Sequence, residues 1–242
     1  MNNEAKSRTA IIYGASGAIG GALCARLVKD GWHVFAGSRG GGGPTGPDIS
    51  PFPFDLRNEG TIAASAKLLR ETLPELVIVA TGMLTSDDGA GPERTYKRLD
   101  PNNMADNFTL NTIGPALIAK HILPLLPRDR RSVFAALSAR VGSIGDNGLG
   151  GWHSYRASKA ALNMLLKNFA IELERTHGQA IIAGLHPGTV DSALSAPFQG
   201  NLPDGQLTQP EDAARHLLRV IEGLTVADSG SVFDWAGERI RP

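Results

Sequence analysis

The sequence predicts a single-domain α/β fold in which helices cover a doubly wound parallel sheet of about seven strands. Short apolar bursts alternate with longer stretches of helical periodicity, in the order strand, helix, strand, helix. Several of the bursts are nearly continuous apolar runs, which is typical of parallel strands buried on both faces. No internal repeat or linker divides residues 1–242, so we expect one domain throughout.

The apolar pattern gives approximate positions for these elements. Strands are expected at residues 9–13, 33–37, 52–54, 76–80, 133–137, 181–185 and 232–235. Helices are expected at residues 20–29, 61–73, 103–126, 155–175 and 211–222. The stretch 39–51 contains four consecutive glycines and three prolines, so we expect a loop there rather than a crossover helix.

Charge and cysteine content exclude several classes of protein. The chain has 24 Lys and Arg residues against 24 Asp and Glu residues, and such a balance argues against a nucleic-acid partner. Its one cysteine, Cys24, can form neither an internal disulfide nor a zinc site of the cysteine type, and no carboxylate spacing suggests another metal. Glycines interrupt the uncharged run 9–25, which is therefore a poor export signal or membrane span. We expect a cytoplasmic protein without membrane or metal association.

A glycine-rich turn follows the first expected strand and opens directly into a helix. Glycines at such a turn let the backbone approach a pyrophosphate, whose charge lies on the free N–H groups of the helix start. The alternative is a glycine-rich turn without a ligand. The residues expected to contact a dinucleotide here are Gly14, Ser16, Gly17, Ile19 and Gly20.

The end of the second strand distinguishes between the two nicotinamide dinucleotides. A free ribose 2′-hydroxyl usually meets an acidic residue there, but this chain has Ser38 and Arg39, and no acid occurs between Asp30 and Asp48. A guanidinium next to a hydroxyl suits a 2′-phosphate. The sequence therefore favours NADP over NAD, unless Arg39 is an ordinary surface arginine.

Tyr155 and Lys159 stand one turn apart on the same face of the expected helix 155–175. At about 4 Å and an effective dielectric constant near 20, the ammonium would stabilise the phenolate by about 4 kcal/mol. This would lower the pKa of the tyrosine by about three units towards neutrality and make it a proton donor and acceptor. An isolated pair at this spacing could also merely share a helix surface.

Together these motifs resemble the short-chain dehydrogenase/reductase family, and the resemblance extends over essentially the whole chain. It includes the glycine turn, the Tyr-x-x-x-Lys pair, Asn111 and the segment 187–192, which reads Pro-Gly-Thr-Val-Asp-Ser. Residues 138–143 and 151–155 are most similar to the C-factor and sniffer-type subgroup. The resemblance implies a Rossmann fold and hydride transfer between NADP and a carbonyl compound or alcohol.

The resemblance also implies roles for individual residues. Tyr155 would be the acid/base, Lys159 would lower its pKa and hold the nicotinamide ribose, and Asn111 would orient a proton-relay water. Asp55 and Leu56 match an adenine contact, although a turn or capping aspartate is an alternative. The remaining positions expected to bind the cofactor are Ala80, Thr81, Gly82, Pro187, Gly188, Val190 and Ser192.

The chain departs from the family pattern at three places. The glycine expected at Ala18 is displaced, and the asparagine of the usual Asn-Ala-Gly segment is missing from Ala80-Thr81-Gly82. The serine that polarises the substrate carbonyl is expected at the end of the fifth strand, where Ser138 is followed by Ala139. We predict that Ser138 has this role, with Ser143 as the alternative.

The resulting expectation is an NADP(H)-dependent oxidoreductase for a small to medium apolar carbonyl compound or secondary alcohol. The stretch 193–209 is expected to form a substrate lid with an apolar inner face, or else an ordinary surface excursion. Apolar residues on several faces of helix 155–175, together with the resemblance, imply a homodimer or homotetramer. The alternative function is an NAD(P)-binding regulatory protein of C-factor type with little turnover.

Overall fold

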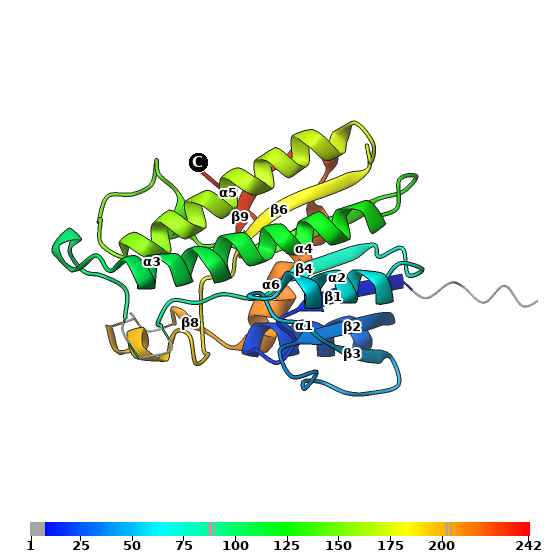
Figure 1. The fold of residues 1–242 in the computed structure, drawn as a ribbon, viewed down its shortest axis with the longest axis horizontal. Coiled ribbons are helices and arrows are strands. Elements are labelled where there is room, and N and C mark those ends of the chain that lie inside the picture. Colours follow the sequence, from blue (N-terminus) through cyan, green and yellow to red (C-terminus); the bar gives the residue numbers. More distant parts are fainter. Residues whose placement is uncertain (1–7, 87–88, 90, 202, 204) are drawn as a thin grey trace, which may run out of the picture.

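An eight-stranded sheet forms the centre of the computed structural model, which describes residues 8–86, 89, 91–201, 203 and 205–242 (Figure 1). The strand order is β10-β9-β6-β5-β4-β1-β2-β3, and every neighbouring pair is parallel except β10 with β9. The strands are β1 (Arg8–Tyr13), β2 (Trp32–Ser38), β3 (Ile49–Pro53), β4 (Leu76–Val79), β5 (Ser132–Leu137), β6 (Ala180–His186), β9 (Ser231–Asp234) and β10 (Arg239–Ile240). The predicted doubly wound α/β fold is confirmed.

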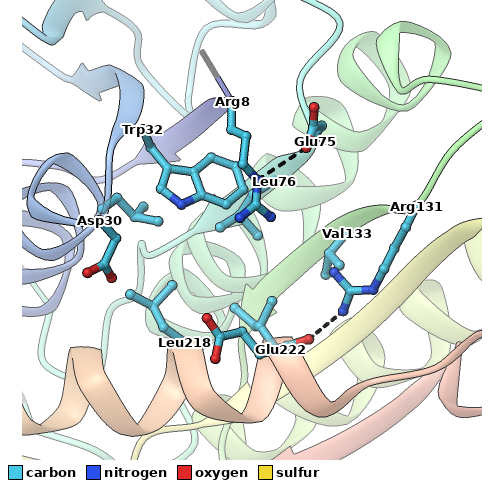
Figure 2. Close-up of a pocket in the computed structure, with 11 residues that line it drawn as sticks. Arg8, Asp30, Trp32, Glu75, Leu76, Arg131, Val133, Leu218 and Glu222 are labelled. Atoms are coloured by element: carbon cyan, nitrogen blue, oxygen red, sulfur yellow. Dashed lines mark hydrogen bonds and ion pairs between the residues drawn. The ribbon is translucent and has the colours of Figure 1, made fainter. Parts of the chain in front are cut away.

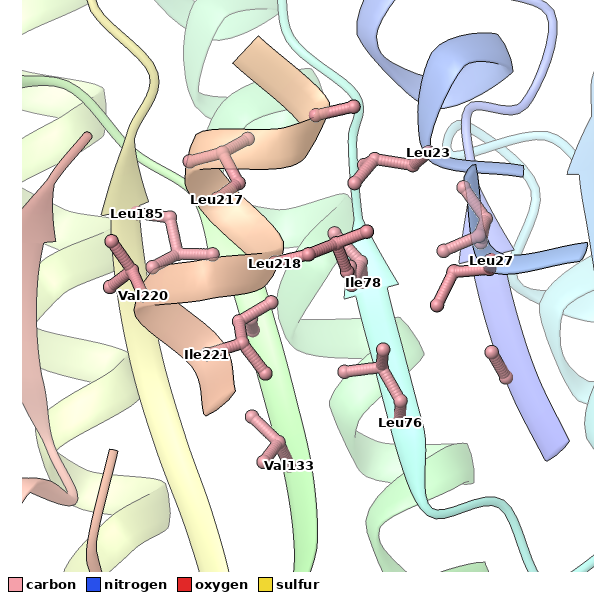
Figure 3. Packing of buried hydrophobic residues seen from close by; sticks show 14 of the residues in the cluster. Leu23, Leu27, Leu76, Ile78, Val133, Leu185, Leu217, Leu218, Val220 and Ile221 are labelled. Carbon is pink, nitrogen blue, oxygen red and sulfur yellow. The ribbon is translucent and has the colours of Figure 1, made fainter. Parts of the chain in front are cut away.

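Helices cover both faces of this sheet. They are α1 (Ala18–Lys29), α2 (Glu59–Leu68), α3 (Pro101–Phe108), α4 (Gly114–Ile122), α5 (His153–Glu174) and α6 (Pro210–Gly223). Helices α1 and α6 pack on one face, where Leu218 and Ile221 of α6 lie near Ile78 and Val133 of the sheet (Figure 3). Helices α2, α4 and α5 bury the second apolar cluster on the opposite face. The two cores hold the strands rigidly, so their carboxyl ends offer a fixed edge for a site.

The expected helix over residues 103–126 is not one continuous helix. It consists of α3, a π-helical turn (Thr109–Ile113), α4 and a 3₁₀ turn (Leu123–Leu125). Pro115 has no N–H with which to bond the carbonyl of Asn111, so a regular α-helix cannot continue through this point. The apolar periodicity hid this interruption, which lies at a residue expected to act in the reaction.

The other boundaries agree with the expectation within a few residues, and no helix occurs between Ser38 and Ile49, as the run of glycines predicts. Two further elements differ from the expectation. Strand β10 was not expected, because Arg239 and Ile240 are too few residues to show a pattern. A separate small sheet pairs β7 (Thr189–Val190) with β8 (Leu207–Thr208).

Candidate functional site

A cavity of about 830 Å³ lies at the carboxyl ends of the parallel strands. It is bounded by Ile19 at the start of α1, by Ser138 after β5, by Tyr155 on α5, and by residues after β6. Ligands of open α/β sheets bind at this edge, outside the carboxyl ends of the strands. Its size falls within the range of small-molecule and cofactor sites.

Helix α5 presents three polar side chains at intervals of one turn: Tyr155, Lys159 and Asn163. The Nζ atom of Lys159 donates a hydrogen bond to the carbonyl of Leu137 at 2.8 Å and lies 5.8 Å from the centre of the Tyr155 ring. The end of β5 therefore fixes the lysine beside the tyrosine. The structure brings together the pair that the spacing predicts.

The electrostatics of this pair differ from the expectation. Burial raises the pKa of Tyr155 to about 12 and lowers the pKa of Lys159 from 10.5 to about 8. The expected lowering of the Tyr155 pKa towards neutrality is wrong for the protein alone, because loss of hydration outweighs attraction by an ammonium that is itself poorly hydrated. A phenol of this kind stays protonated at neutral pH.

Of the two candidate serines, Ser138 lines the cavity and Ser143 does not appear among the described lining residues. The hydroxyl of Ser138 donates to Oδ1 of Asn163 at 2.6 Å, so α5 orients it as well. Ser143 is buried and accepts a hydrogen bond from the Asp146 N–H at 3.0 Å. Asn163 is a residue that sequence reasoning missed, although its spacing of four from Lys159 was a usable signal.

Asn111 lies in the π-helical turn and is fully buried. Its side chain accepts from the Met83 N–H and donates to the Met83 carbonyl, both at 2.8 Å, and it also donates to Ser158 at 3.2 Å. These bonds connect the segment after β4 to α5. Asn111 therefore lies close to Lys159 but is fully engaged with protein groups.

A ladder of side-chain amides continues from Asn111 away from the cavity. Asn111 donates to Asn107 at 3.3 Å, Asn107 donates to Asn103 at 3.1 Å, and Asn103 donates to the carboxylate of Glu93 at 2.9 Å. All donors point in the same direction, towards the one charged group. Spacing of four among the three asparagines was the available signal, and the sequence reasoning did not use it.

Glu93 also holds the first turn of α5. Its carboxylate accepts hydrogen bonds from the hydroxyl and the N–H of Ser154, and its carbonyl accepts from the N–H of Trp152. Burial would raise the pKa of Glu93, but the hydrogen bonds from Ser154 and Asn103 keep it below its ordinary value. Glu93 thus links the helix that carries Tyr155 to the turn that carries Asn111.

The glycine turn fits a dinucleotide. Gly14 has φ +92°, and a Cβ there would lie 2.9 Å from the Ala80 carbonyl oxygen, while a Cβ on Gly20 would lie 2.1 Å from the Gly14 carbonyl oxygen. No side chain caps α1 at Gly17, and Ser16 is exposed beside it, so the N–H groups of the first turn remain for a ligand. Ile19, one residue into α1, lines the cavity.

Ser38 and Arg39 lie at the end of β2, next to this turn in the sheet. The Ser38 hydroxyl donates to the Gly42 carbonyl and fixes the glycine loop, whose Gly43 lies beside Ala15. Arg39 is exposed and forms no ion pair among the described residues. The guanidinium is therefore available, whereas the hydroxyl already has an acceptor.

The segment after β4 borders both the glycine turn and Asn111. A Cβ on Gly82 would lie 3.6 Å from Oδ1 of Asn111 and 3.7 Å from Nζ of Lys159, and Ala80 faces Gly14. The hydroxyl of Thr81 is buried and has no hydrogen-bond partner in the described part of the chain. An unpaired buried hydroxyl is costly, so Thr81 fits a site that a ligand completes.

Asp55 and Leu56 follow β3 and have visible structural roles. Asp55 accepts from the Arg57 N–H at 2.9 Å, which is a turn contact. Leu56 is buried under Gly114, where a Cβ would lie 2.7 Å from the leucine side chain. The local geometry explains both residues without a ligand, as the alternative interpretation of Asp55 proposed.

The segment 187–192 lines the cavity after β6. Gly188 has φ +77°, Pro187 and Ser192 border the cavity, and Val190 is buried in β7. Pairing of β7 with β8 closes the excursion between them, so its two ends are held side by side. Phe198, within this excursion, packs on Trp152 with ring centres 5.3 Å apart. Residues 202 and 204 of the expected lid lie outside the described residues.

A second cavity, of about 70 Å³, lies at the opposite edge of the sheet, between the amino ends of the strands and α6 (Figure 2). Arg8 pairs with Glu75 at 3.4 Å and lies over the Trp32 ring, and Arg131 donates to the carbonyl of Ile221 at 2.6 Å. The volume is far too small for a dinucleotide. Arg8, Glu75 and Arg131 there already have protein partners.

Metal sites and membrane-spanning helices are two further features that the described residues could have contained. No group of three or more histidines, cysteines and acidic residues is arranged to hold a metal ion in this part of the chain. In the same residues, none of the helices has the length and apolar character needed to cross a membrane.

Comparison with known proteins agrees with the geometry. The family model described as short chain dehydrogenase matches residues 8–202. C-signal of Myxococcus xanthus is 37% identical over 142 residues, which are 59% of this chain and 80% of that protein. The 1-hydroxy-2-glutathionyl-2-methyl-3-butene dehydrogenase of Rhodococcus sp. (strain AD45) is 30% identical over 92% of this chain and 94% of its own length.

Solved structures give the same result. An NADPH-bound carbonyl reductase from chicken fatty liver superposes with a TM-score of 0.82 at 25% identity, over 99% of this chain and 96% of that one. A short-chain dehydrogenase/reductase from Burkholderia multivorans with bound NADP superposes with a TM-score of 0.81 at 25% identity, over 98% of this chain and all of that one. The carbonyl reductase Sniffer of D. melanogaster, at 19% identity, shares the fold with a TM-score of 0.81. The chain belongs to the short-chain dehydrogenase/reductase family.

Proposed function

We propose that this oxidoreductase uses NADP(H) to interconvert a carbonyl compound and its alcohol at the cavity beside Tyr155. The observation that carries the proposal is that Tyr155 and Ser138 line one cavity, which Ile19 after the glycine turn also lines, while Lys159 is held beside Tyr155. The bound dinucleotide would supply or accept the hydride, and the protein would supply position and proton transfer.

The proposed proton donor is the hydroxyl of Tyr155. Because burial raises its pKa to about 12, the phenol is protonated at neutral pH and carries the proton that carbonyl reduction requires. The hydroxyl of Ser138, which donates to Oδ1 of Asn163 in the structure, would turn its proton to the substrate oxygen when a substrate is bound. The ammonium of Lys159 would stabilise the phenolate that remains, and Asn111 would hold the segment after β4 in place.

The preference for NADP rests on Arg39. Its unpaired guanidinium at the end of β2 is suited to a 2′-phosphate, and the similar chicken and Burkholderia structures contain NADPH and NADP. Replacement by alanine should raise the Kd of NADPH by about tenfold to hundredfold and leave that of NADH nearly unchanged. Fluorescence titration measures both, with Arg219→Ala as the control for an exposed arginine on α6. Equal losses for both cofactors would contradict this role.

The substrate is proposed to be a small to medium apolar carbonyl compound. Leu149, Trp152, Leu194 and Phe198 line the outer part of the cavity, and the last two belong to the proposed lid 193–209. The compound named for the Rhodococcus relative is an alcohol that carries a glutathionyl group, so that name supports the alcohol chemistry and not the apolar character.

Similarity to C-signal supports a second function, a nucleotide-binding regulator with little turnover. Ala139 after Ser138 and Ala80-Thr81-Gly82 in place of the usual segment also favour it. The two proposals differ in one assay, NADPH oxidation with a panel of ketones, aldehydes and quinones. Turnover supports the reductase, whereas tight NADPH binding without turnover of any member supports the regulator.

Oligomerisation and a cytoplasmic location remain predictions. Met164 and Ile171 on α5 are large apolar side chains that stay exposed, which supports self-association through this helix. Light scattering should give a mass at least twice that of one chain, and a monomeric mass would contradict the prediction.

A further inference from the structure

Three arginines line the part of the cavity that the proposed cofactor contacts do not use: Arg94, Arg140 and Arg156. Among the lining residues that the structure describes, the one carboxylate is Asp146. His186 is also present, but burial lowers its pKa to about 4, so it is neutral at physiological pH. Three arginines thus face one carboxylate among the described lining residues.

Protein carboxylates neutralise only one of these arginines. Arg140 pairs with Asp234 at 2.7 Å and with Asp146 at 3.5 Å, so it uses the local acidic groups. Neither Arg94 nor Arg156 forms an ion pair within the described chain. Two cations thus border the cavity without a counter-charge.

Arg156 is the more constrained of the two. Its Nε atom is buried and has no hydrogen-bond partner among the residues that the structure describes, and its Nη1 atom makes a long bond of 3.3 Å to the Val141 carbonyl. A buried donor without a partner destabilises the protein, and more so when the group is charged. Such a group suits an anion that arrives with a ligand.

The position of Arg156 relates it to the substrate rather than to the dinucleotide phosphates. Arg156 follows Tyr155 on α5 and contacts Val141 in the loop after β5. The glycine turn follows β1, which is separated from β5 by strand β4. Arg94 lies near Trp152, because the carbonyl of the preceding residue, Glu93, accepts a hydrogen bond from the N–H of Trp152 at 2.5 Å. Both arginines therefore border the apolar surface of Trp152 and Phe198.

We propose that Arg156, assisted by Arg94 at the rim, binds a carboxylate of the substrate. The substrate class is then an aldehyde or ketone with an apolar body and a carboxylate beyond it, so that the carbonyl reaches Tyr155. This inference rests on the proposed reductase function and narrows its substrate. Charge-assisted, bidentate hydrogen bonds are the usual way in which guanidinium groups select carboxylates.

The test compares two substrates that differ only in this charge, 4-formylbenzoate and its methyl ester. The wild-type enzyme should reduce the acid with a kcat/KM at least about tenfold above that of the ester. Arg156→Gln should lower kcat/KM for the acid by about tenfold to hundredfold and change that for the ester by less than about threefold. Arg94→Gln should also lower kcat/KM for the acid, but by a smaller factor. Arg156→Lys should retain part of the preference for the acid over the ester.

A binding measurement keeps this inference separate from the reductase function. Calorimetry with the unreactive pair 4-methylbenzoate and its methyl ester, in the presence of NADP⁺, tests the subsite without any turnover. Tighter binding of the acid, lost in Arg156→Gln and weakened by salt, supports the subsite even if no carbonyl compound is reduced. Equal binding of acid and ester by the wild-type protein would overturn the inference, while reduction of the ester alone would leave the reductase function intact.

Discussion

The two ends of the central sheet carry comparable polar groups but differ in the size of the cavity that these groups border. At the amino end, Arg8 and Arg130 share Glu75, and Arg131 bonds two backbone carbonyls around a cavity of about 70 Å³ (Figure 2). At the carboxyl end, the cavity is more than tenfold larger, and Thr81 and Arg156 leave buried atoms unpaired. Among the described residues, unpaired buried atoms also occur at the amino end, at Ser132 and His177, so the two ends differ in the space beside such groups. The small cavity admits no dinucleotide, whereas the large one can hold a ligand next to its polar groups.

The largest expected difference between the two ends of the sheet is the effect on kcat of replacing Tyr155. Removing its hydroxyl in Tyr155→Phe should lower kcat by about 10²–10⁴-fold, which is the usual contribution of a positioned proton donor. Affinity for NADPH should change little, because the ring remains. The amino-end counterpart is Trp32→Phe, next to Arg8, which should leave kcat unchanged. Loss of folding in Tyr155→Phe, seen by circular dichroism, would make the kcat result uninformative, so Ser138→Ala is measured alongside and should also lower kcat.

Lys159 should make stability depend on pH. Its pKa falls from 10.5 in the unfolded chain to about 8 in the folded protein, so burial of the ammonium costs stability below pH ~8. That cost disappears as the pH rises towards 10.5, because the folded protein loses the proton first. Between pH ~7.5 and ~9.5, the free energy of unfolding of the wild type should rise by about 2 kcal/mol relative to that of Lys159→Met. Urea unfolding measures both, and parallel pH curves would show that Lys159 is not perturbed.

Two glycines provide a matched pair of backbone substitutions. Gly14 at the carboxyl end has φ +92°, and Gly31 at the amino end has φ +82° with open space around a Cβ. Alanine should cost about 1–2 kcal/mol of stability at each site through backbone strain, and more at Gly14, where it meets the Ala80 carbonyl. NADPH affinity should fall at least about tenfold in Gly14→Ala only. Equal affinities of the two variants would remove the glycine turn from the cofactor site.

Two glutamates provide the second pair. Glu93→Gln should cost about 1.5–3 kcal/mol of stability and lower kcat, since it weakens charge-assisted hydrogen bonds that hold Ser154 and the asparagine ladder. Glu75→Gln should cost at most about 1 kcal/mol and leave kcat unchanged, since Arg8 and Arg130 are largely exposed. An unchanged kcat for Glu93→Gln, at preserved fold, would show that the ladder serves stability alone.

Much of the fold and part of the site could be predicted from local patterns. Apolar runs locate the buried strands, and the glycines of the first turn are required by close backbone contacts that any dinucleotide-binding turn has. Tyr155 and Lys159 share a helix face, so their proximity follows from spacing alone. For the same reason, Asn163 and the ladder of Asn103, Asn107 and Asn111 could have been found.

The rest depends on tertiary structure. Glu93 lies far from Ser154 in the sequence, and nothing local indicates that its carboxylate holds the start of α5. The interruption around Asn111 follows from Pro115, but its form, a π-helical turn, depends on packing. The pKa of Tyr155 was expected in the wrong direction because spacing reveals the neighbouring charge and not the loss of water around both groups.

The most direct measurement follows hydride from the dinucleotide to the substrate. NADPH that carries deuterium at the transferable position is incubated with the enzyme and a carbonyl compound that it consumes, and the alcohol is analysed by mass spectrometry. We predict one deuterium at the former carbonyl carbon with the wild-type protein, and at least about a hundredfold less product in the same time with Tyr155→Phe. An alcohol without deuterium, or saturated NADPH binding without any alcohol, would contradict a reductase site at the carboxyl end of the sheet.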